Sequence, residues 1–127
     1  MTQKEVVLSK YAPDPVGPYS QAVKANGFIY MSGQIALNQE TGEMNNQSFE
    51  SEVHQVLINI QYVLKAADIS FKDVVKVTVF LTDMTTFPIF NAIYEKYLSE
   101  PFPARSTIEV SHLPKDARIE IEAVALA

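Results

Sequence analysis

Polar and charged side chains gather in the last third of the chain, on two segments whose patterns predict β-strands. In residues 105–110 the alternation of a strand places Arg105 and Thr107 on one face. In residues 118–125 the same alternation sets Glu120 apart from the isoleucines on either side of it. A guanidinium binds a carboxylate through two parallel hydrogen bonds, and a second carboxylate nearby can move protons. These residue types therefore indicate binding and acid–base chemistry on a small anion.

The predicted geometry of this cluster depends on how the two strands pair. Ile108 and Val110 indicate a core on one face of the first strand, so that Arg105 and Thr107 face a polar or interfacial space. If the two strands form a hairpin, both residues lie near the level of Glu120. The alternative is a set of exposed charges on edge strands with an ordinary salt bridge, and the pattern itself does not separate the two readings.

Other chemistry finds little support in the sequence. The chain has no cysteine, so it can form no disulfide and offers no thiolate nucleophile or ligand. It contains no phosphate-binding loop, dinucleotide fingerprint or nucleophile elbow. The two histidines, His54 and His112, stand apart from any carboxylate at metal-ligand spacing, and we interpret them as a helix and a turn residue. We therefore predict no metal site.

Length and charge limit the range of functions. The 127 residues fit one domain, which we place at 1–127. The net charge of −5 repels phosphate backbones, so we expect no nucleic-acid partner. No apolar run reaches the length of a membrane span, and residues 1–11 lack the apolar stretch of a signal peptide. We expect a cytoplasmic protein that does not bind a membrane.

Hydrophobic periodicity predicts an α+β domain with the element order ββαβαββ. An Asn-Gly pair at 26–27 indicates a hairpin between the first two strands, and Ser48 is a candidate cap for the first helix, with Glu50 and Glu52 in its first turn. The predicted strands are 20–24, 28–37, 74–82, 105–110 and 118–125, with one more at 6–9; the predicted helices are 49–67 and 87–98.

The strand at 74–82 is apolar on both faces, with Val75 and Val77 assigned to one side and Val74 and Phe80 to the other. Right-handed crossovers place both helices on one face of a single sheet. The other face then needs a cover. A symmetric oligomer is the simplest candidate.

Residues 102–116 read FPARSTIEVSHLPKD and are followed by IEIEA at 119–123. Three further distinctive segments are GPYSQA at 17–22, SGQI at 32–35 and VKVTVF at 75–80. Together these segments resemble the reactive-intermediate deaminase (RidA/YjgF) family, and Asn91 falls where that family has an asparagine. The resemblance runs through nearly the whole chain with compatible spacing.

The resemblance implies a chorismate-mutase-like fold, a mostly antiparallel mixed sheet with two helices on one face, assembled as a homotrimer with sites between subunits. It implies that Arg105 holds the substrate carboxylate and that Glu120 handles the water or proton. It also implies a cleft lined by Tyr19, Ser32, Gly33, Asn91 and Thr107. Many family members carry cysteine where this chain has Thr107, so a thiol-dependent role is in doubt here.

The implied activity is hydrolysis of 2-imino acids to 2-keto acids and ammonia, as in a 2-iminobutanoate/2-iminopropanoate deaminase. Such imines arise from enamines released by PLP-dependent dehydratases. An imine carbon is already activated, so we expect no cofactor. The main alternative is a regulatory module that binds keto or imino acids without turnover. A ribonuclease or translation inhibitor is a third possibility, disfavoured by the net charge of −5.

Overall fold

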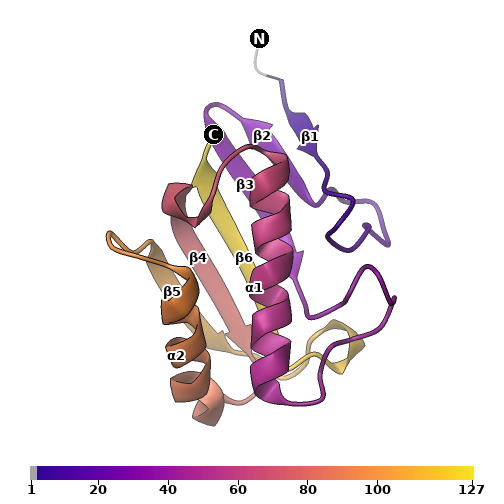
Figure 1. Ribbon diagram of the computed structural model, residues 1–127, viewed down its shortest axis with the longest axis vertical. Coiled ribbons are helices and arrows are strands. Elements are labelled where there is room, and N and C mark those ends of the chain that lie inside the picture. The colour runs from indigo at the N-terminus through magenta and orange to yellow at the C-terminus, as the bar shows by residue number, and fades with distance from the viewer. Residues whose placement is uncertain (1–2) are drawn as a thin grey trace.

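The computed structural model describes residues 3–127, which form one six-stranded sheet with two helices. The strand order across the sheet is β1-β2-β3-β6-β4-β5. Both helices lie on the same face, α1 over the middle of the sheet and α2 toward the β5 edge (Figure 1). The α+β class predicted from the sequence is confirmed. The strands are β1 (Glu5–Val7), β2 (Ala22–Ala25), β3 (Phe28–Gln34), β4 (Val74–Leu81), β5 (Ala104–Glu109) and β6 (Ile119–Leu126).

The predicted hairpin joins β2 to β3 through Asn26 and Gly27, whose φ angles are 51° and 81°. Two adjacent residues with positive φ are typical of the tight turns that match strand twist. β3 ends at Gln34 rather than continuing to residue 37 as predicted. The chain leaves the sheet there, and Leu37 makes only an isolated bridge to Met44.

Helix α1 (Phe49–Ala66) begins where the sequence predicts and ends one residue before the predicted end at 67. Ser48 caps it, because its side chain accepts a hydrogen bond from the Ser51 backbone N–H and the Ser51 side chain accepts one from the Ser48 N–H. After the cap residue Ala67, Asp68 has a φ of 59°, which ends the helical path. Helix α2 (Phe87–Tyr97) starts with a proline in its first turn, where the missing N–H costs no hydrogen bond.

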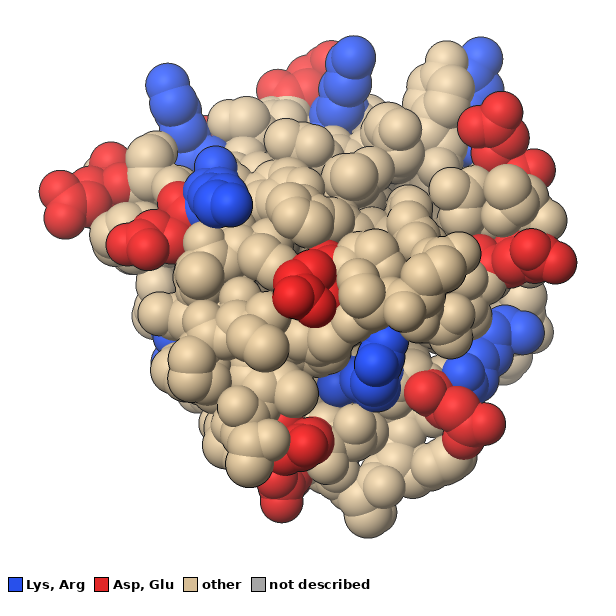
Figure 2. Space-filling view, turned by 60° about the horizontal axis from the view of Figure 1, so that its bottom comes forward, with Lys and Arg blue, Asp and Glu red and all other residues tan. Residues whose placement is uncertain are grey.

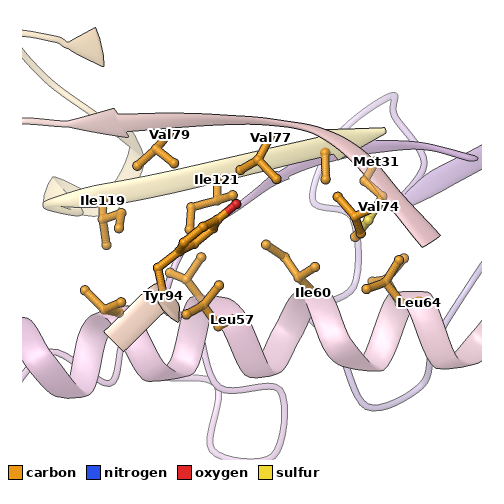
Figure 3. Packing of buried hydrophobic residues seen from close by; sticks show 14 of the residues in the cluster. Met31, Leu57, Ile60, Leu64, Val74, Val77, Val79, Tyr94, Ile119 and Ile121 are labelled. Carbon is orange, nitrogen blue, oxygen red and sulfur yellow. The ribbon is translucent and has the colours of Figure 1, made fainter. Parts of the chain in front are cut away.

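The core lies between the helices and one face of the sheet. Leu57, Ile60 and Leu64 of α1 point toward Val77 of β4 and Ile121 of β6 (Figure 3). All five side chains are buried. Burial of apolar surface stabilises the folded protein by about 25 cal/mol for each Å² removed from water. No described helix is both long and apolar enough to cross a membrane.

The last two strands do not form the hairpin considered above. β5 pairs with β4 in parallel after the α2 crossover, and β6 pairs with β4 on its other side, antiparallel. Since β4 separates β5 from β6, the predicted proximity of Arg105 and Thr107 to Glu120 within one chain is wrong.

The face of the sheet away from the helices carries exposed apolar side chains. A register shift between Val74 and Lys76 sends Val74 into the core and leaves Val75 exposed, the reverse of the predicted alternation. Ile108, predicted to face a core, lies on this face and is 43 % exposed. Tyr30 is 46 % exposed there as well. Among residues 3–127, no helix covers this open face (Figure 1).

Candidate active site

Arg105 projects from β5 toward helix α2, where three aromatic rings surround its guanidinium. The guanidinium carbon lies 4.8 Å from the centre of the Tyr94 ring, 5.4 Å from that of Phe87 and 5.5 Å from that of Phe90. Arg105 pairs with Val77 of β4, which sets it on the helix-bearing face. Contacts of a cation with ring faces help to hold the guanidinium in place.

The guanidinium lines a cavity of about 350 Å³ together with Asn91, Tyr94, Glu95, Phe102 and Pro103. The two ion pairs of the described residues join Arg118 to Glu52 and His112 to Asp116, so Arg105 has no carboxylate partner in residues 3–127. A cation without a partner, at the wall of a cavity, is suited to bind an anionic ligand. The structure thereby brings Arg105 and Asn91 together, as predicted.

Tyr94 links this cavity to the core. The side chain is buried, with the hydroxyl directed toward the sheet (Figure 3). Its oxygen has no hydrogen-bond partner among the described residues. Burial raises the pKa of the Tyr94 hydroxyl, and the positive charge of Arg105 opposes part of that rise. Tyr94 therefore stays a neutral phenol beside the guanidinium.

Thr107 follows Arg105 on the same face of β5, opposite Val79 of β4. It is half-buried and lines neither the Arg105 cavity nor the Glu120 cavity as the described residues form them.

Glu120 lies on the open face of the sheet, in a second cavity of about 510 Å³. Tyr19, Ser32 and Gly33 line the same cavity, so the structure brings these predicted site residues together. Burial raises the pKa of the Glu120 carboxyl above its ordinary value, and the negative charge of Glu122 raises it further. A carboxyl with a raised pKa can exchange protons closer to neutral pH.

The loop and strand around Glu120 are fixed by backbone contacts. The Ser32 hydroxyl donates to the Ser20 carbonyl oxygen at 2.6 Å, and the Ser32 N–H donates to the Gln21 carbonyl oxygen at 2.9 Å. These bonds tie β3 to the segment that carries Tyr19, which is half-exposed over the cavity.

The start of β6 is held by a buried carboxylate on α1. Glu52, 1 % exposed, accepts hydrogen bonds from the Arg118 backbone N–H at 2.6 Å and from its Nε at 2.7 Å. The Arg118 guanidinium also donates to the Asn46 carbonyl oxygen and lies over the Phe49 ring. Since Arg118 precedes Glu120 by two residues, this contact fixes the strand that presents Glu120.

Within one chain the two cavities are separate. Arg105 lies on the helix-bearing face, whereas Glu120 pairs with Phe80 and lies on the open face. The structure thus divides the predicted site residues into two groups, Arg105 with Asn91 and Glu120 with Tyr19, Ser32 and Gly33.

The sequence gives no direct sign of several residues that shape these cavities. Phe87, Phe90 and Tyr94 are part of the predicted apolar stripe of α2, which indicates core and says nothing of Arg105. An acidic residue such as Glu52 is expected in the first turn of a helix, because it interacts favourably with the helix dipole. This explanation needs no partner, so the buried contact of Glu52 with Arg118 was not predicted. A carboxylate on the apolar side of a helix is the signal that could have revealed it, because a buried charge requires a partner.

No group of three His, Asp or Glu side chains in residues 3–127 is arranged to hold a metal ion. His54 instead makes a 2.7 Å hydrogen bond through Nδ1 to the Tyr97 hydroxyl, which joins α1 to α2. His112 is exposed beside Asp116.

Comparison with known families agrees with the fold. The model of the family described as Endoribonuclease L-PSP matches residues 9–127. The chain belongs to this family. Proteins similar to this chain are named as members of the RutC family, of the Rid family or as Reactive Intermediate Deaminase A. The predicted RidA/YjgF membership is therefore confirmed.

Three relatives illustrate the range of the L-PSP family. A RutC family protein of Pyrococcus horikoshii is 49 % identical over 122 residues, covering 96 % of this chain and 97 % of its own. A Dermatophagoides farinae protein named 2-iminobutanoate/2-iminopropanoate deaminase is 40 % identical over 126 residues, covering 99 % and 98 %. The crystal structure of YyfA of Yersinia pestis, of the conserved Rid family, superposes with a TM-score of 0.96 at 44 % identity, covering 98 % and 100 %.

Proposed function

We propose that this protein hydrolyses short 2-imino acids to 2-keto acids and ammonia. The observation that carries the proposal is the presence of two unusual groups, each at the wall of its own cavity: an arginine without an ion-pair partner, held by aromatic rings, and a half-buried carboxyl of raised pKa. The first is suited to bind a substrate carboxylate, and the second to move protons. The 40 % identity to a protein named 2-iminobutanoate/2-iminopropanoate deaminase supports this assignment.

In the proposed mechanism, Arg105 binds the substrate carboxylate and so places the imine carbon. Glu120, as the carboxylate, takes a proton from a water molecule while the water oxygen bonds to that carbon. The protonated Glu120 then returns a proton to the nitrogen of the tetrahedral adduct. The nitrogen is then an amino group on the carbon that also bears the new hydroxyl. Glu120 takes the hydroxyl proton and passes it to this nitrogen as the carbon–nitrogen bond breaks, so that ammonia leaves and the carbon–oxygen bond becomes the keto group.

We propose further that the protein is a homotrimer and that each site is shared by two subunits. One subunit supplies Arg105 with Asn91 and Thr107, and its neighbour supplies Glu120 with Tyr19, Ser32 and Gly33. Two features support this arrangement. Arg105 and Glu120 lie on opposite faces of one sheet, and the open face carries exposed apolar side chains that an oligomer would bury.

A binding module that senses keto or imino acids without turnover is the main competing function. Glu120 favours catalysis over binding alone. Its carboxylate would repel the carboxylate of the ligand, so it is useful in the site only if it transfers protons during a reaction. For the nuclease activity in the family's description, a basic surface would be needed. Figure 2 shows acidic and basic side chains interspersed on the face it presents, without a continuous basic stripe, and the net charge is −5.

A coupled assay separates an enzyme from a binding module. An amino acid dehydratase generates the imine, semicarbazide traps it, and keto-acid formation is followed. The proposal predicts that the protein diverts imine from semicarbazide to keto acid, without added cofactor and equally well after EDTA dialysis. Identical semicarbazone yields with and without the protein would contradict catalysis.

A further inference from the structure

Gly33 lies directly against the carboxylate of Glu120. A Cβ atom built on Gly33 would overlap Oε2 of Glu120 and would lie only 2.7 Å from its Cδ and 3.0 Å from its Cγ. Non-bonded carbon atoms prefer separations of about 3.5–4.0 Å. The Glu120 side chain therefore lies across the Cα of Gly33, in the space that any other residue would fill with its own side chain.

The backbone conformation gives no other reason for glycine at this position. Gly27 and Gly42 have φ angles of 81° and 74°, in the left-handed region where a Cβ is strained. Gly33 does not have a positive φ. What requires glycine at position 33 is the volume occupied by Glu120.

A β-bulge creates this contact. Met31 pairs with Ala123, but Gln34 pairs with Ile121, so two residues of β3, Ser32 and Gly33, oppose the single residue Glu122 of β6. Bulges bend a strand and redirect its side chains, and they are frequent beside active sites. Here the extra residue brings the bare Cα of Gly33 under the neighbouring carboxylate.

We propose that Gly33 is a positioning residue whose missing side chain forms the seat of the Glu120 carboxylate. The catalytic consequence rests on the proposed function of Glu120. The seat keeps the carboxylate partly buried and close to Glu122, the two causes of its raised pKa. A side chain at position 33 moves the carboxylate out of the seat toward solvent, and its pKa falls toward the ordinary value.

Gly33→Ala tests the seat directly. The displaced atoms are the end of a flexible side chain, so the variant should fold. A misplacement of about 1 Å can slow catalysis by about 10²-fold, so we expect turnover to fall by about 10- to 10²-fold. The acid limb of the pH–rate profile should move to lower pH. Gly17→Ala is the matched control, because its Cβ meets only the Tyr19 ring at 3.8 Å, an ordinary contact.

A double-mutant cycle identifies the partner. Glu120→Asp shortens the side chain by one methylene and removes the atom that overlaps the Cβ most closely, Oε2, so Gly33→Ala should cost less activity in a Glu120→Asp background. If Gly33→Ala fails to fold while the double variant folds, the steric contact is supported. Additive losses in the cycle, or misfolding of both variants, would overturn the proposal.

Carboxyl NMR titration keeps the seat testable apart from catalysis. The Glu120 pKa in Gly33→Ala should be lower than in the unsubstituted protein, whether or not the protein hydrolyses imines. If the Glu120 pKa is lower in Gly33→Ala but the unsubstituted protein has no deaminase activity, the positioning role of Gly33 is supported and the proposed function is wrong. An unchanged Glu120 pKa in Gly33→Ala would contradict the positioning role itself.

Discussion

The guanidinium carbon of Arg105 lies 4.8 Å from the centre of the Tyr94 ring, so a residue of α2 helps to fix the group that we propose as the anion anchor. The contacts of Arg105 with α2 are made by aromatic rings, and no acidic side chain of residues 3–127 forms an ion pair with it. The charge is therefore fixed in direction yet open to a ligand. Its position depends on rings that the sequence presents only as core.

Replacing Arg105 tests its role as the carboxylate anchor. A hydrogen bond to a charged group contributes about 1.5–3 kcal/mol, so Arg105→Ala should weaken 2-ketobutyrate binding by about one to a few orders of magnitude. Arg105→Lys keeps the charge without the planar fork and should recover only part of the loss. Calorimetric titration measures both. Trimeric variants that bind the keto acid as tightly as the unsubstituted protein would exclude the anchor role.

The Tyr94 ring should contribute to the same affinity through Arg105. A cation–π contact contributes about 1–2 kcal/mol when desolvated, so Tyr94→Leu should weaken keto-acid binding by about 5- to 30-fold. Tyr94→Phe is the matched control: it keeps the ring and removes a buried hydroxyl that has no partner among the described residues. Binding to Tyr94→Phe should be unchanged. Equal losses in the two variants would show that the hydroxyl, not the ring, matters.

Glu120→Gln should lower turnover and raise stability together. Loss of a general acid–base group slows catalysis by about 10² or more. A raised pKa means that the folded protein disfavours the ionised carboxyl, so Glu120 costs stability once pH rises above its ordinary pKa. The variant should therefore melt higher than the unsubstituted protein near neutral pH, and the difference should vanish in acid. A lower melting temperature at neutral pH would assign Glu120 a structural role.

The Glu52–Arg118 contact should matter for stability. Glu52→Gln removes a charge that accepts two short hydrogen bonds in a buried position and should cost about 2 kcal/mol in the free energy of unfolding. Glu50→Gln, an exposed change in the same first turn of α1, is the control and should alter the free energy of unfolding by no more than about 0.5 kcal/mol. Denaturant titration measures both. Equal stabilities would mean that the contact adds nothing to folding.

Local patterns predicted the helices well because their causes are local. The cap at Ser48, the break at Asp68 and the turn at Asn26 each depend on nearby residues. Strand partners were not predictable in the same way. The hairpin reading assumed that consecutive strands pair, but β4 lies between β5 and β6, a choice set by packing across the whole sheet.

The candidate site shows the same division. Alternation correctly placed Arg105 and Thr107 together on one face of β5, but it assigned the core to the wrong face: both residues lie on the helix-bearing face, and Ile108 lies on the open one. It could not reveal the bulge at Ser32 and Gly33, because a bulge inserts one residue into the pairing and leaves the local pattern readable as a strand. Nor could it reveal that Arg105 and Glu120 lie on opposite faces of the sheet.

Mixing two inactive variants tests the central claim, that Arg105 of one subunit and Glu120 of the next complete one site. Arg105→Ala and Glu120→Gln are refolded together in equal amounts, and imine hydrolysis is measured beside each variant alone. In a trimer with sites shared around the ring, about a quarter of the sites recover both native residues. We predict about a quarter of the unsubstituted activity in the mixture. Trimers of mixed composition that stay as inactive as their parents would contradict a site shared between subunits.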